Sequence, residues 1–442
     1  MHKVKTAVLV ISIMFLVLFT ANNCFSEIYY TSDVLIGEKA IGLGGAFSAI
    51  ADSPEACFYN PAGLVLATVP YLSVSAQVAE YSEQKGKFLF SKNEKFYSQE
   101  LVPSFWGISR DLGPGRIGFS IAVPYYYAYE LHQRYDNKKI NPFDSATIIK
   151  DKKTMDKTYL IGPSYGYKIN PDLFIGSTIY FNYKVFKEQN NTYINGYGKG
   201  FSAFNKAVNE NDGSGIGISS IFGLLFKYSE KLNLSTVFKS GDFATNNVNY
   251  KSDTFQYTEI GDSTSFVPVP PVDKTIKNKF QMPPSTTFGL AYRLNTKVFF
   301  SYDISYFFPV AYNIDYIKYN SSSKEFETLT KRIQKRNIFN HNVGGEYMIT
   351  ENIPLRLGFY TNYSLAPEID INNVEEKSTH IDKYGISLSS GMISENSTLM
   401  INLKYGFGKG EMASYNFDKK GYEKQDLIFS SYGIGLSGSY WF

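Results

Sequence analysis

The strongest constraint on this chain is a two-residue period of apolar and polar side chains. Between residues 298 and 308 the even positions are all apolar, while Ser301, Asp303 and Ser305 lie between them. Successive side chains of a strand point to opposite faces, so this pattern predicts a strand with one apolar and one largely polar face. The sequence contains about fourteen such segments, at residues 70–82, 100–112, 116–129, 156–169, 172–187, 215–228, 232–241, 284–294, 297–308, 337–349, 353–364, 382–392, 396–408 and 428–442.

The connections between these segments alternate in length. Short ones with turn-forming residues are "GPG" at 113, "NPD" at 170, "SEK" at 229, "NT" at 295, "TEN" at 350 and "SEN" at 394. Long polar ones cover residues 83–99, 130–155, 188–214, 242–283, 309–336, 365–381 and 409–427. This alternation is expected of an up-and-down barrel that crosses a membrane, with tight periplasmic turns and long outer loops. The sequence therefore predicts an all-β fold, a transmembrane antiparallel β-barrel of about fourteen strands within residues 68–442.

The last segment ends on an aromatic residue. Its apolar face carries Tyr432, Ile434, Leu436, Tyr440 and Phe442. An alternating strand closed by a terminal aromatic resembles the sorting signal of bacterial outer-membrane barrels. The alternative is an ordinary edge strand that ends on Phe442 by chance, and it would leave an apolar edge open to aggregation.

Residues 1–26 are typical of an export signal. A basic start precedes an apolar run at residues 7–19, and Ser26 suits a cleavage site. The run is short for a membrane span. Lipid modification of Cys24 is an alternative, although two asparagines stand where lipoproteins have small residues. Cleavage after residue 26 would leave Cys57 as the only cysteine, which excludes an internal disulfide, and we expect it to be buried.

Composition argues against several function classes. The chain has 36 Tyr and 35 Phe but only four His and two Cys, so metal-binding and nucleophilic residues are scarce. The sequence offers no nucleophile–base pair, metal-ligand cluster or phosphate-binding loop, so we expect neither an enzyme nor a cofactor or metal. Removal of residues 1–26 takes away two lysines and no acid, which lowers the net charge from +3 to +1. Without a concentrated basic face, a nucleic-acid partner is not expected.

Residues 27–67 remain between the export signal and the first strand. They are rich in small residues and partly apolar, and Pro54 and Pro61 exclude one regular helix. The segment is longer than a leader needs. We therefore expect it to lie in the barrel lumen as a plug, or hatch.

The stretch "GEKAIGLGGAFSAIADSPEACFYNPAGL" resembles the N-terminal hatch of the FadL/TodX-type outer-membrane transporters of long-chain fatty acids and aromatic hydrocarbons. The hatch residues that we single out are Gly44, Gly45, Asp52, Asn60, Pro61 and Ala62. With the fourteen strands and Phe442, the resemblance covers the whole mature chain. It implies passive uptake of a hydrophobic small molecule, such as a fatty acid, in the outer membrane of a diderm bacterium. The implied steps are capture by the loops, binding in the lumen and movement of the hatch, and outer-membrane lipid is the other expected partner.

The second and third strands, "LVPSFWGISRDLGPGRIGFSIAVPYYYAYEL", carry a further resemblance. The family has a proline in the second strand, matched by Pro103, and a Pro-aromatic-Gly in the third, where this chain has Pro124, Tyr125 and Tyr126. A proline cannot donate to the strand ladder and so favours a bulge or kink. In the family this kink opens a lateral gate into the bilayer. Because Tyr126 replaces the glycine, two interpretations stay open: a lateral gate at residues 124–126, or a tolerated proline without an opening.

Three basic residues are candidates for binding a carboxylate head group. The alternation places Lys184, Arg356 and Lys404 on the inner face of the barrel. Asp303 and Glu346 are expected on the same face. Pairing of these charges with one another across the lumen is therefore an equally good interpretation.

Two function classes remain open. Barrels with a similar opening segment include PorV-type relatives, which serve protein secretion as a shuttle or scaffold, so the alternative to uptake is a secretion scaffold or a structural barrel. A continuous apolar cavity between hatch and wall would favour uptake, and a filled lumen would favour the scaffold.

Two of the long connections have further features. The stretch "SFVPVPPVDK" in 242–283 could dock a ligand or act as a spacer, and residues 321–335 could form a short helix with a basic end.

Overall fold

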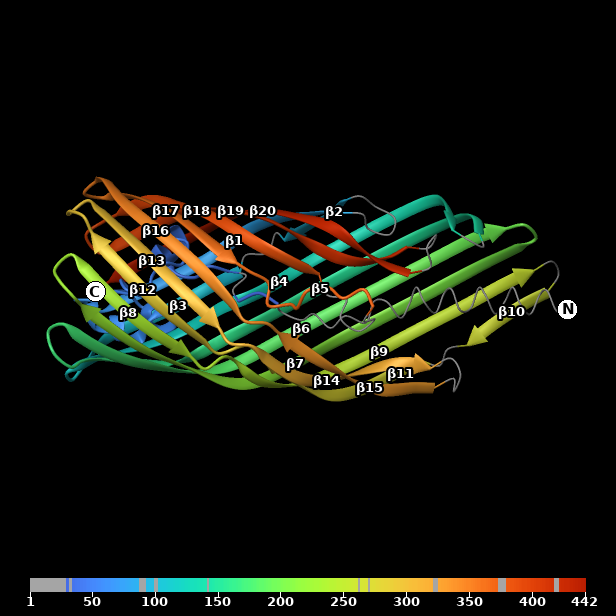
Figure 1. Ribbon diagram of the computed structural model, residues 1–442, viewed down its shortest axis with the longest axis horizontal. Helices are drawn as coiled ribbons and strands as arrows, with labels where there is room; N and C mark the ends of the chain where they lie inside the picture. The colour runs from blue at the N-terminus through green and yellow to red at the C-terminus, as the bar shows by residue number, and fades with distance from the viewer. Residues whose placement is uncertain are drawn as a thin grey trace.

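The wall of the protein is a closed antiparallel β-barrel (Figure 1). The computed structural model describes residues 29–31, 34–86, 93–98, 102–140, 143–260, 263–268, 271–320, 325–372, 379–416 and 421–442. The wall strands in these residues are β1 (Tyr71–Gly86), β3 (Val102–Leu112), β4 (Gly115–Ile140), β5 (Phe143–Lys168), β6 (Leu173–Gly198), β7 (Phe201–Lys227), β8 (Leu232–Lys239), β12 (Ser285–Arg293), β13 (Val298–Phe307), β16 (Ile338–Thr350), β17 (Ile353–Asn362), β18 (His380–Ile393), β19 (Ser397–Asn416) and β20 (Gly421–Trp441). Each pairs with the next, and β20 pairs with β1 from Trp441 opposite Tyr71 onward, which closes the ring.

The prediction of a fourteen-stranded barrel is confirmed, since every expected segment overlaps one wall strand. The short connections are tight turns that side chains stabilise locally. The Asn170 side chain accepts hydrogen bonds from the backbone amides of Asp172 and Leu173 at 2.9 and 2.8 Å. The Asn295 side chain accepts in the same way from the backbone amides of Lys297 and of Val298, the first residue of β13. Short polar side chains that bond their own backbone favour turns, so these positions end one strand and start the next.

The outer face of the wall carries a band of exposed apolar side chains. On β6 the outward residues Ile175, Ile179, Phe181 and Tyr183 are exposed, while Tyr180 between them is fully buried. Beyond this band the outward side chains of β6 become polar. A lipid-facing apolar band flanked by aromatic residues is characteristic of membrane barrels.

The expected long polar loops are wrong in part, because much of their length is strand. β4, β5, β6 and β7 have 26 or 27 residues and continue well past the apolar band. Additional strands β9 (Phe243–Ile260), β10 (Ser263–Pro268) and β11 (Val272–Gln281) extend this sheet beside the outer half of β7. Figure 1 shows these strands projecting beyond the shorter ones on the other side of the barrel. Pairing in hairpins satisfies the backbone N–H and C=O groups of these polar segments. Cross-strand ion pairs such as that of Lys187 with Glu210 stabilise the pairing further.

The short helix expected at residues 321–335 is wrong. From Glu325 to Lys335 the chain forms β15, which pairs along its whole length with β14 (Val310–Asn320). Threonines at 328 and 330 and Ile333 favour a strand, and the neighbouring segment supplies a partner. Strand pairing with β14 therefore overrides the helical tendency of residues 325–335.

The N-terminal segment, residues 34–67, lies inside the ring of strands (Figure 1). It contains α2 (Glu38–Gly42), α3 (Ala56–Tyr59) and the 3-10 helix η1 (Pro61–Leu66). Its own apolar core consists of Ala40, Leu43, Phe47, Ala51, Ala56, Cys57 and Leu64, all fully buried. The segment makes hydrogen bonds to β1, β7, β13, β17 and β19, which are distributed around the ring. A segment that reaches strands on all sides must occupy the lumen.

The expected export signal, residues 1–26, lies outside the described residues. Within the described part of the chain, no helix combines the length and the apolar character needed to cross a membrane.

Candidate functional site

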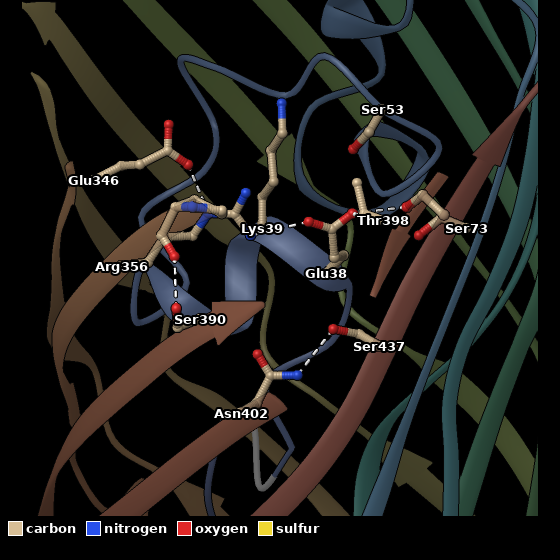
Figure 2. Close-up of polar contacts among 12 residues, drawn as sticks. Glu38, Lys39, Ser53, Ser73, Glu346, Arg356, Ser390, Thr398, Asn402 and Ser437 are labelled. Carbon is tan, nitrogen blue, oxygen red and sulfur yellow. Dashed lines mark hydrogen bonds and ion pairs between the residues drawn. The ribbon is translucent and has the colours of Figure 1, made fainter. Parts of the chain in front are cut away.

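A buried ion network fixes the N-terminal segment to β17 and β19. The Arg356 guanidinium lies 2.9 Å from the Glu38 carboxylate and 2.6 Å from Glu346 (Figure 2). The Arg356 and Glu38 side chains are only 1% and 2% exposed. Hydroxyls of Thr398 and Ser439 donate to the second oxygen of Glu38 at 2.6 and 2.8 Å. Burial raises the pKa of the Glu38 carboxyl, but Arg356 and these hydroxyls outweigh it and hold that pKa below its usual range.

A second set of bonds joins the segment to β13. The Asp303 carboxylate accepts hydrogen bonds from the amides of Phe47 and Ser48 at 3.1 and 3.0 Å, and from the Ser48 hydroxyl at 2.7 Å. Just before these residues, Gly44 and Gly45 have φ angles of +62° and +84°. Glycine adopts this left-handed region without strain, so the pair turns the chain out of α2 and towards Asp303.

Asn60 joins the segment to β7 and starts η1. Its side-chain amide donates to the carbonyls of Ser48 at 2.8 Å and Leu224 at 3.2 Å, and its side-chain oxygen accepts from the Ala62 amide at 3.1 Å. The last bond caps the first turn, where Pro61 has no N–H to leave unsatisfied. The Asn-Pro-Ala motif thus combines a helix cap with a bond to the wall.

Asp52 has a different environment from these residues. It pairs with Lys39 of the same segment at 2.8 Å, and the two side chains are 39% and 29% exposed. It therefore stabilises the segment internally, and it makes no bond of this kind to the described residues of the wall.

The β4 ladder is interrupted at Pro124. Ala122 pairs with Leu160 and Tyr125 with Thr158, so β4 has one extra residue there, and residues 123 and 124 have no partner on β5. On the other side, pairing with β3 ends at Ala122. Among the described residues, the next pairing on that side joins Glu130 to Tyr97 of β2 (Asn93–Ser98). Among the described residues, positions 123–129 of β4 thus have no backbone partner on the β3 side, and we call this stretch the break in β4.

The N-terminal segment contacts this break directly. The Val34 amide donates a hydrogen bond of 3.3 Å to the Pro124 carbonyl. Val34 and Ile36 also pack in one buried cluster with Val123 and Tyr126. Of the expected gate residues, Pro124 and Tyr126 therefore contact the segment, and Tyr125 lines the cavity described next.

A cavity of about 150 Å³ lies between the N-terminal segment and the wall. Its apolar lining includes Leu35, Tyr125, Leu160, Ile221, Met282 and Phe307. Its polar lining includes Ser48, Asp242, Thr287, Asn342 and Lys239. A cavity with an apolar part and a few convergent polar groups is typical of a small-molecule site.

Lys239 is the cation of this cavity that sequence reasoning missed. Its amino group lies 3.7 Å from the centre of the Phe58 ring and 5.9 Å from that of Tyr59. Among the described residues it forms no ion pair. The nearby Asp242 is buried, which raises the pKa of its carboxyl, and it accepts a hydrogen bond from Asn182 at 3.2 Å. Alternation along β8, with Phe238 exposed, was a signal that could have placed Lys239 inside.

Residues 32–372 match the family described as "Outer membrane protein transport protein (OMPP1/FadL/TodX)". The chain belongs to the OMPP1/FadL/TodX family. This confirms the resemblance that the N-terminal segment and strands indicated, and identifies an outer-membrane transport protein. No curated protein sequence matches the chain.

Solved structures of FadL and TodX proteins share the fold. A Pseudomonas aeruginosa FadL homologue is 12% identical, with a TM-score of 0.63 over 93% of this chain and 99% of that one. The Pseudomonas putida toluene transporter TodX is 14% identical, with a TM-score of 0.63 over 94% and 100%. The CymD monoaromatic hydrocarbon channel is 12% identical, with a TM-score of 0.57 over 92% and 97%. At these identities the likeness establishes the fold alone.

In this FadL/TodX-family barrel the three expected head-group cations have different surroundings. Lys184 lies 2.7 Å from Asp156, with both side chains at most 4% exposed. Arg356 belongs to the Glu38 network described above. Protein carboxylates therefore already balance both charges. Lys404 instead donates to the neutral amide oxygen of Gln77 at 3.0 Å.

Proposed function

We propose that this protein is a passive channel for hydrophobic small molecules that carry a polar end, such as long-chain fatty acids. The observation that carries the proposal is the cavity between the N-terminal segment and the wall, beside the break in β4. In this proposal the cavity is the binding site, the N-terminal segment is the hatch and the break is the lateral exit.

The cavity suits an amphiphile better than a pure hydrocarbon. Its volume of about 150 Å³ is close to that of a protein cavity that holds one benzene ring. Burial of apolar chain stabilises a complex by roughly 0.8 kcal/mol per CH₂, so a few buried methylenes supply useful affinity. Lys239 and the hydroxyls of Ser48 and Thr287 offer partners for a polar end. A long chain exceeds this volume and has to extend further into the lumen.

The hatch role rests on how the N-terminal segment is attached. Polar bonds at Glu38, Phe47, Ser48 and Asn60 are among those that attach it to the wall. A local displacement breaks only the bonds of the part that moves, while the barrel ladders stay intact. A ligand that binds the displaced form more tightly shifts the population towards it, without any other energy source.

The lateral exit rests on the break at Pro124. A closed ladder leaves no path between strands, whereas residues 123–129 of β4 lack described partners on the β3 side. The Val34 bond to Pro124 ties the hatch to the edge of this break. Hatch displacement therefore frees the Pro124 carbonyl as it opens the cavity.

The secretion-scaffold alternative receives less support from these features. A scaffold needs an outer surface for its partner and has no use for a lined cavity between the N-terminal segment and the wall. We therefore rank uptake first.

The test compares two tryptophan variants at neighbouring positions of β12. Thr287 lines the cavity, so Thr287→Trp fills it. Thr286 points to the opposite face, and Thr286→Trp is the matched control. Entry of deuterated dodecanoic acid and of deuterated toluene is measured by mass spectrometry in cells that contain each variant in the outer membrane. We expect Thr287→Trp to lower entry of the acid at least tenfold and Thr286→Trp to leave it unchanged.

The proposal would be refuted if neither compound entered cells with the wild type or with either variant faster than it enters cells that lack the protein. Assembly of each variant is checked by its resistance to unfolding in mild detergent. A folded Thr287→Trp protein that still imports the acid normally would exclude the cavity as the binding site.

A further inference from the structure

The outward face of β9 changes from apolar to polar within a few residues. Phe243, the first residue of this strand, is exposed and pairs with Ile218 of β7, which is exposed as well. The next outward positions of β9 are Thr245, Asn247 and Asn249. Phe243 therefore lies at the outer border of the lipid-facing band in this part of the wall.

Two lysines of β11 lie directly beside the first polar positions. Lys279 pairs with Thr245 and Lys277 pairs with Asn247, and both lysines are exposed, while Asn278 between them is buried. Paired residues of an antiparallel ladder lie on the same face, so these four side chains form one cluster on the outside of the wall. We call Thr245, Asn247, Lys277 and Lys279 the outer-face cluster. Neighbouring strands are about 4.8 Å apart and alternate residues about 6.8 Å apart, so one phosphate group can reach all four side chains.

The side chains of the outer-face cluster make no hydrogen bond or ion pair with the described residues of the chain. The neighbouring polar groups behave differently. One position further out, Asn249 donates to Asp212 at 3.2 Å and accepts from Thr275 at 2.9 Å. The exposed Lys187 has a carboxylate partner in Glu210, at 3.0 Å. The donors of the cluster are therefore left for a group from outside the chain.

Acidic residues on the neighbouring elements face other groups. On β11, Asp273 is paired in register with Lys251 of β9. On β14, which bonds to Asn278 of β11, the Asp315 carboxylate accepts a hydrogen bond from Thr330 at 2.7 Å. The two lysines of the outer-face cluster thus retain a positive charge at the border of the lipid-facing band. Anionic lipid head groups attract lysines at such a border.

Apolar surface continues from the outer-face cluster towards the short turns. Phe243 lies diagonally next to Lys279 and beside Ile218. Further along, Phe222 of β7 and Phe238 of β8 are paired and exposed on the same outer face. A membrane lipid can place its phosphate at the cluster and its acyl chains along this strip. A free phosphate ion would use only the cluster.

We propose that the outer-face cluster binds the phosphate head group of an anionic lipid of the outer leaflet, whose acyl chains pack along Phe243 and the apolar band below it. Lys277 and Lys279 supply charge-assisted hydrogen bonds to the phosphate oxygens. The Asn247 amide and the Thr245 hydroxyl donate to the remaining oxygens. The site lies on the outside of the wall and goes beyond the proposed channel, which uses the lumen. The bound lipid holds β9 and β11 at the membrane surface.

The test counts bound lipid by native mass spectrometry of the purified full chain in a neutral detergent. The probes are lipid A, which carries two phosphates, and phosphatidylcholine, whose head group has no net charge. The double variant Lys277→Gln/Lys279→Gln removes the charge of the cluster, and Lys277→Arg/Lys279→Arg keeps it. The matched control is Lys231→Gln/Lys297→Gln, which removes two exposed lysines from two of the short turns.

The wild type should bind lipid A more tightly than phosphatidylcholine. Lys277→Gln/Lys279→Gln should weaken binding of lipid A about thirtyfold, which is the effect of two lysines near anionic lipid. Its binding of phosphatidylcholine should stay unchanged. The arginine variant and the control should bind lipid A as the wild type does. Folding of each variant is checked by its resistance to unfolding in mild detergent.

Two results would overturn the lipid site. The first is binding of lipid A by Lys277→Gln/Lys279→Gln at the wild-type level. The second is an equal loss in the control, because net charge alone would then explain the effect. Either result leaves the proposed channel intact, since that proposal rests on the cavity in the lumen and is tested by Thr287→Trp.

Competition with an excess of inorganic phosphate separates a lipid site from a site for the free ion. Lipid A that stays bound to the wild type supports the lipid site, because the acyl chains then contribute to binding. Complete displacement by the ion would overturn it, because the apolar strip below the outer-face cluster would then contribute nothing.

Discussion

Glu38 of the N-terminal segment and Arg356 of β17 form an ion pair of 2.9 Å that is almost completely buried. The two residues are 318 positions apart in the sequence. Arg356 also bonds Glu346, so loss of Glu38 leaves the arginine with one partner. The pair therefore determines how firmly the segment is held, more than whether the barrel forms.

Glu38→Gln should loosen the N-terminal segment. Removing one partner of a buried ion pair costs roughly 3 kcal/mol, which corresponds to about a hundredfold rise in the population of the displaced segment. The measurement is amide hydrogen exchange of residues 34–67 in the folded barrel. Lys39→Gln is the control, because its pair with Asp52 is partly exposed and such pairs contribute about 1 kcal/mol or less. Equal exchange in the two variants would contradict the role assigned to Glu38.

Cys57 should report displacement of the segment without any engineered label. It is a fully buried free cysteine, and burial raises the pKa of its thiol to about 11. Since the thiolate is the reactive form, the native protein should react slowly with a maleimide between pH 7 and 9. At a fixed pH in this range the rate should rise when Glu38→Gln displaces the segment, because the thiol is then exposed and its pKa returns towards the ordinary value. Fast labelling of the native protein at pH 7 would show that the segment is already displaced.

The sequence predicts the wall better than its outer extension. Within the lipid band one face of each strand must be apolar, so alternation identifies all fourteen strands. Beyond the band both faces lack this requirement, and the outer halves of β5, β6 and β7 lose the pattern. Backbone hydrogen bonds to neighbouring strands hold these outer halves in place instead. The sequence of one segment does not reveal which strand it pairs with.

The same limit applies to the candidate site. Alternation assigns Lys184 and Arg356 to the inner face, but their carboxylate partners lie on other elements, at Asp156 and Glu38. Only the fold brings such pairs together, so the sequence left open whether these cations are available to a ligand. Lys239 is the last residue of β8, and the alternation of that strand could have placed it inside.

The double variant Asn60→Ala, Pro61→Gly should change what the protein retains on purification. Loss of Asn60 removes its bonds to the carbonyls of Ser48 and Leu224 and leaves buried groups without partners, at a cost of about 1–3 kcal/mol each. The measurement is mass spectrometry of hydrophobic compounds that copurify with each protein. We expect one class of amphiphile in the wild type and a clearly lower amount in the variant. Retention of detergent alone by both proteins would contradict a ligand site controlled by this segment.

Gly358→Ala should displace the segment by steric overlap. A methyl group at residue 358 would overlap the backbone at Leu43 and Gly44, which cannot move independently of the turn. Gly345→Ala on the neighbouring strand is the control, because its methyl group would lie at an ordinary 3.4 Å from the Phe300 ring. Maleimide labelling of Cys57 should rise at least tenfold in Gly358→Ala and stay at the wild-type rate in Gly345→Ala. If neither variant changes the rate, Gly358 is not a close support of the segment.

Pro124→Ala should slow release of ligand into the bilayer. Alanine restores a backbone N–H at the break in β4, which allows pairing with a neighbouring strand and so favours a closed wall. Pro163→Ala is the control, because this proline lies on β5 outside the break, on an exposed position of the wall. Release of a fluorescent fatty acid from the protein into the lipid of a nanodisc is followed by stopped-flow fluorescence. We expect a several-fold slower rate for Pro124→Ala, with equilibrium binding to the cavity unchanged. Release at the wild-type rate by both variants would exclude the break as the exit and direct the ligand past the N-terminal segment instead.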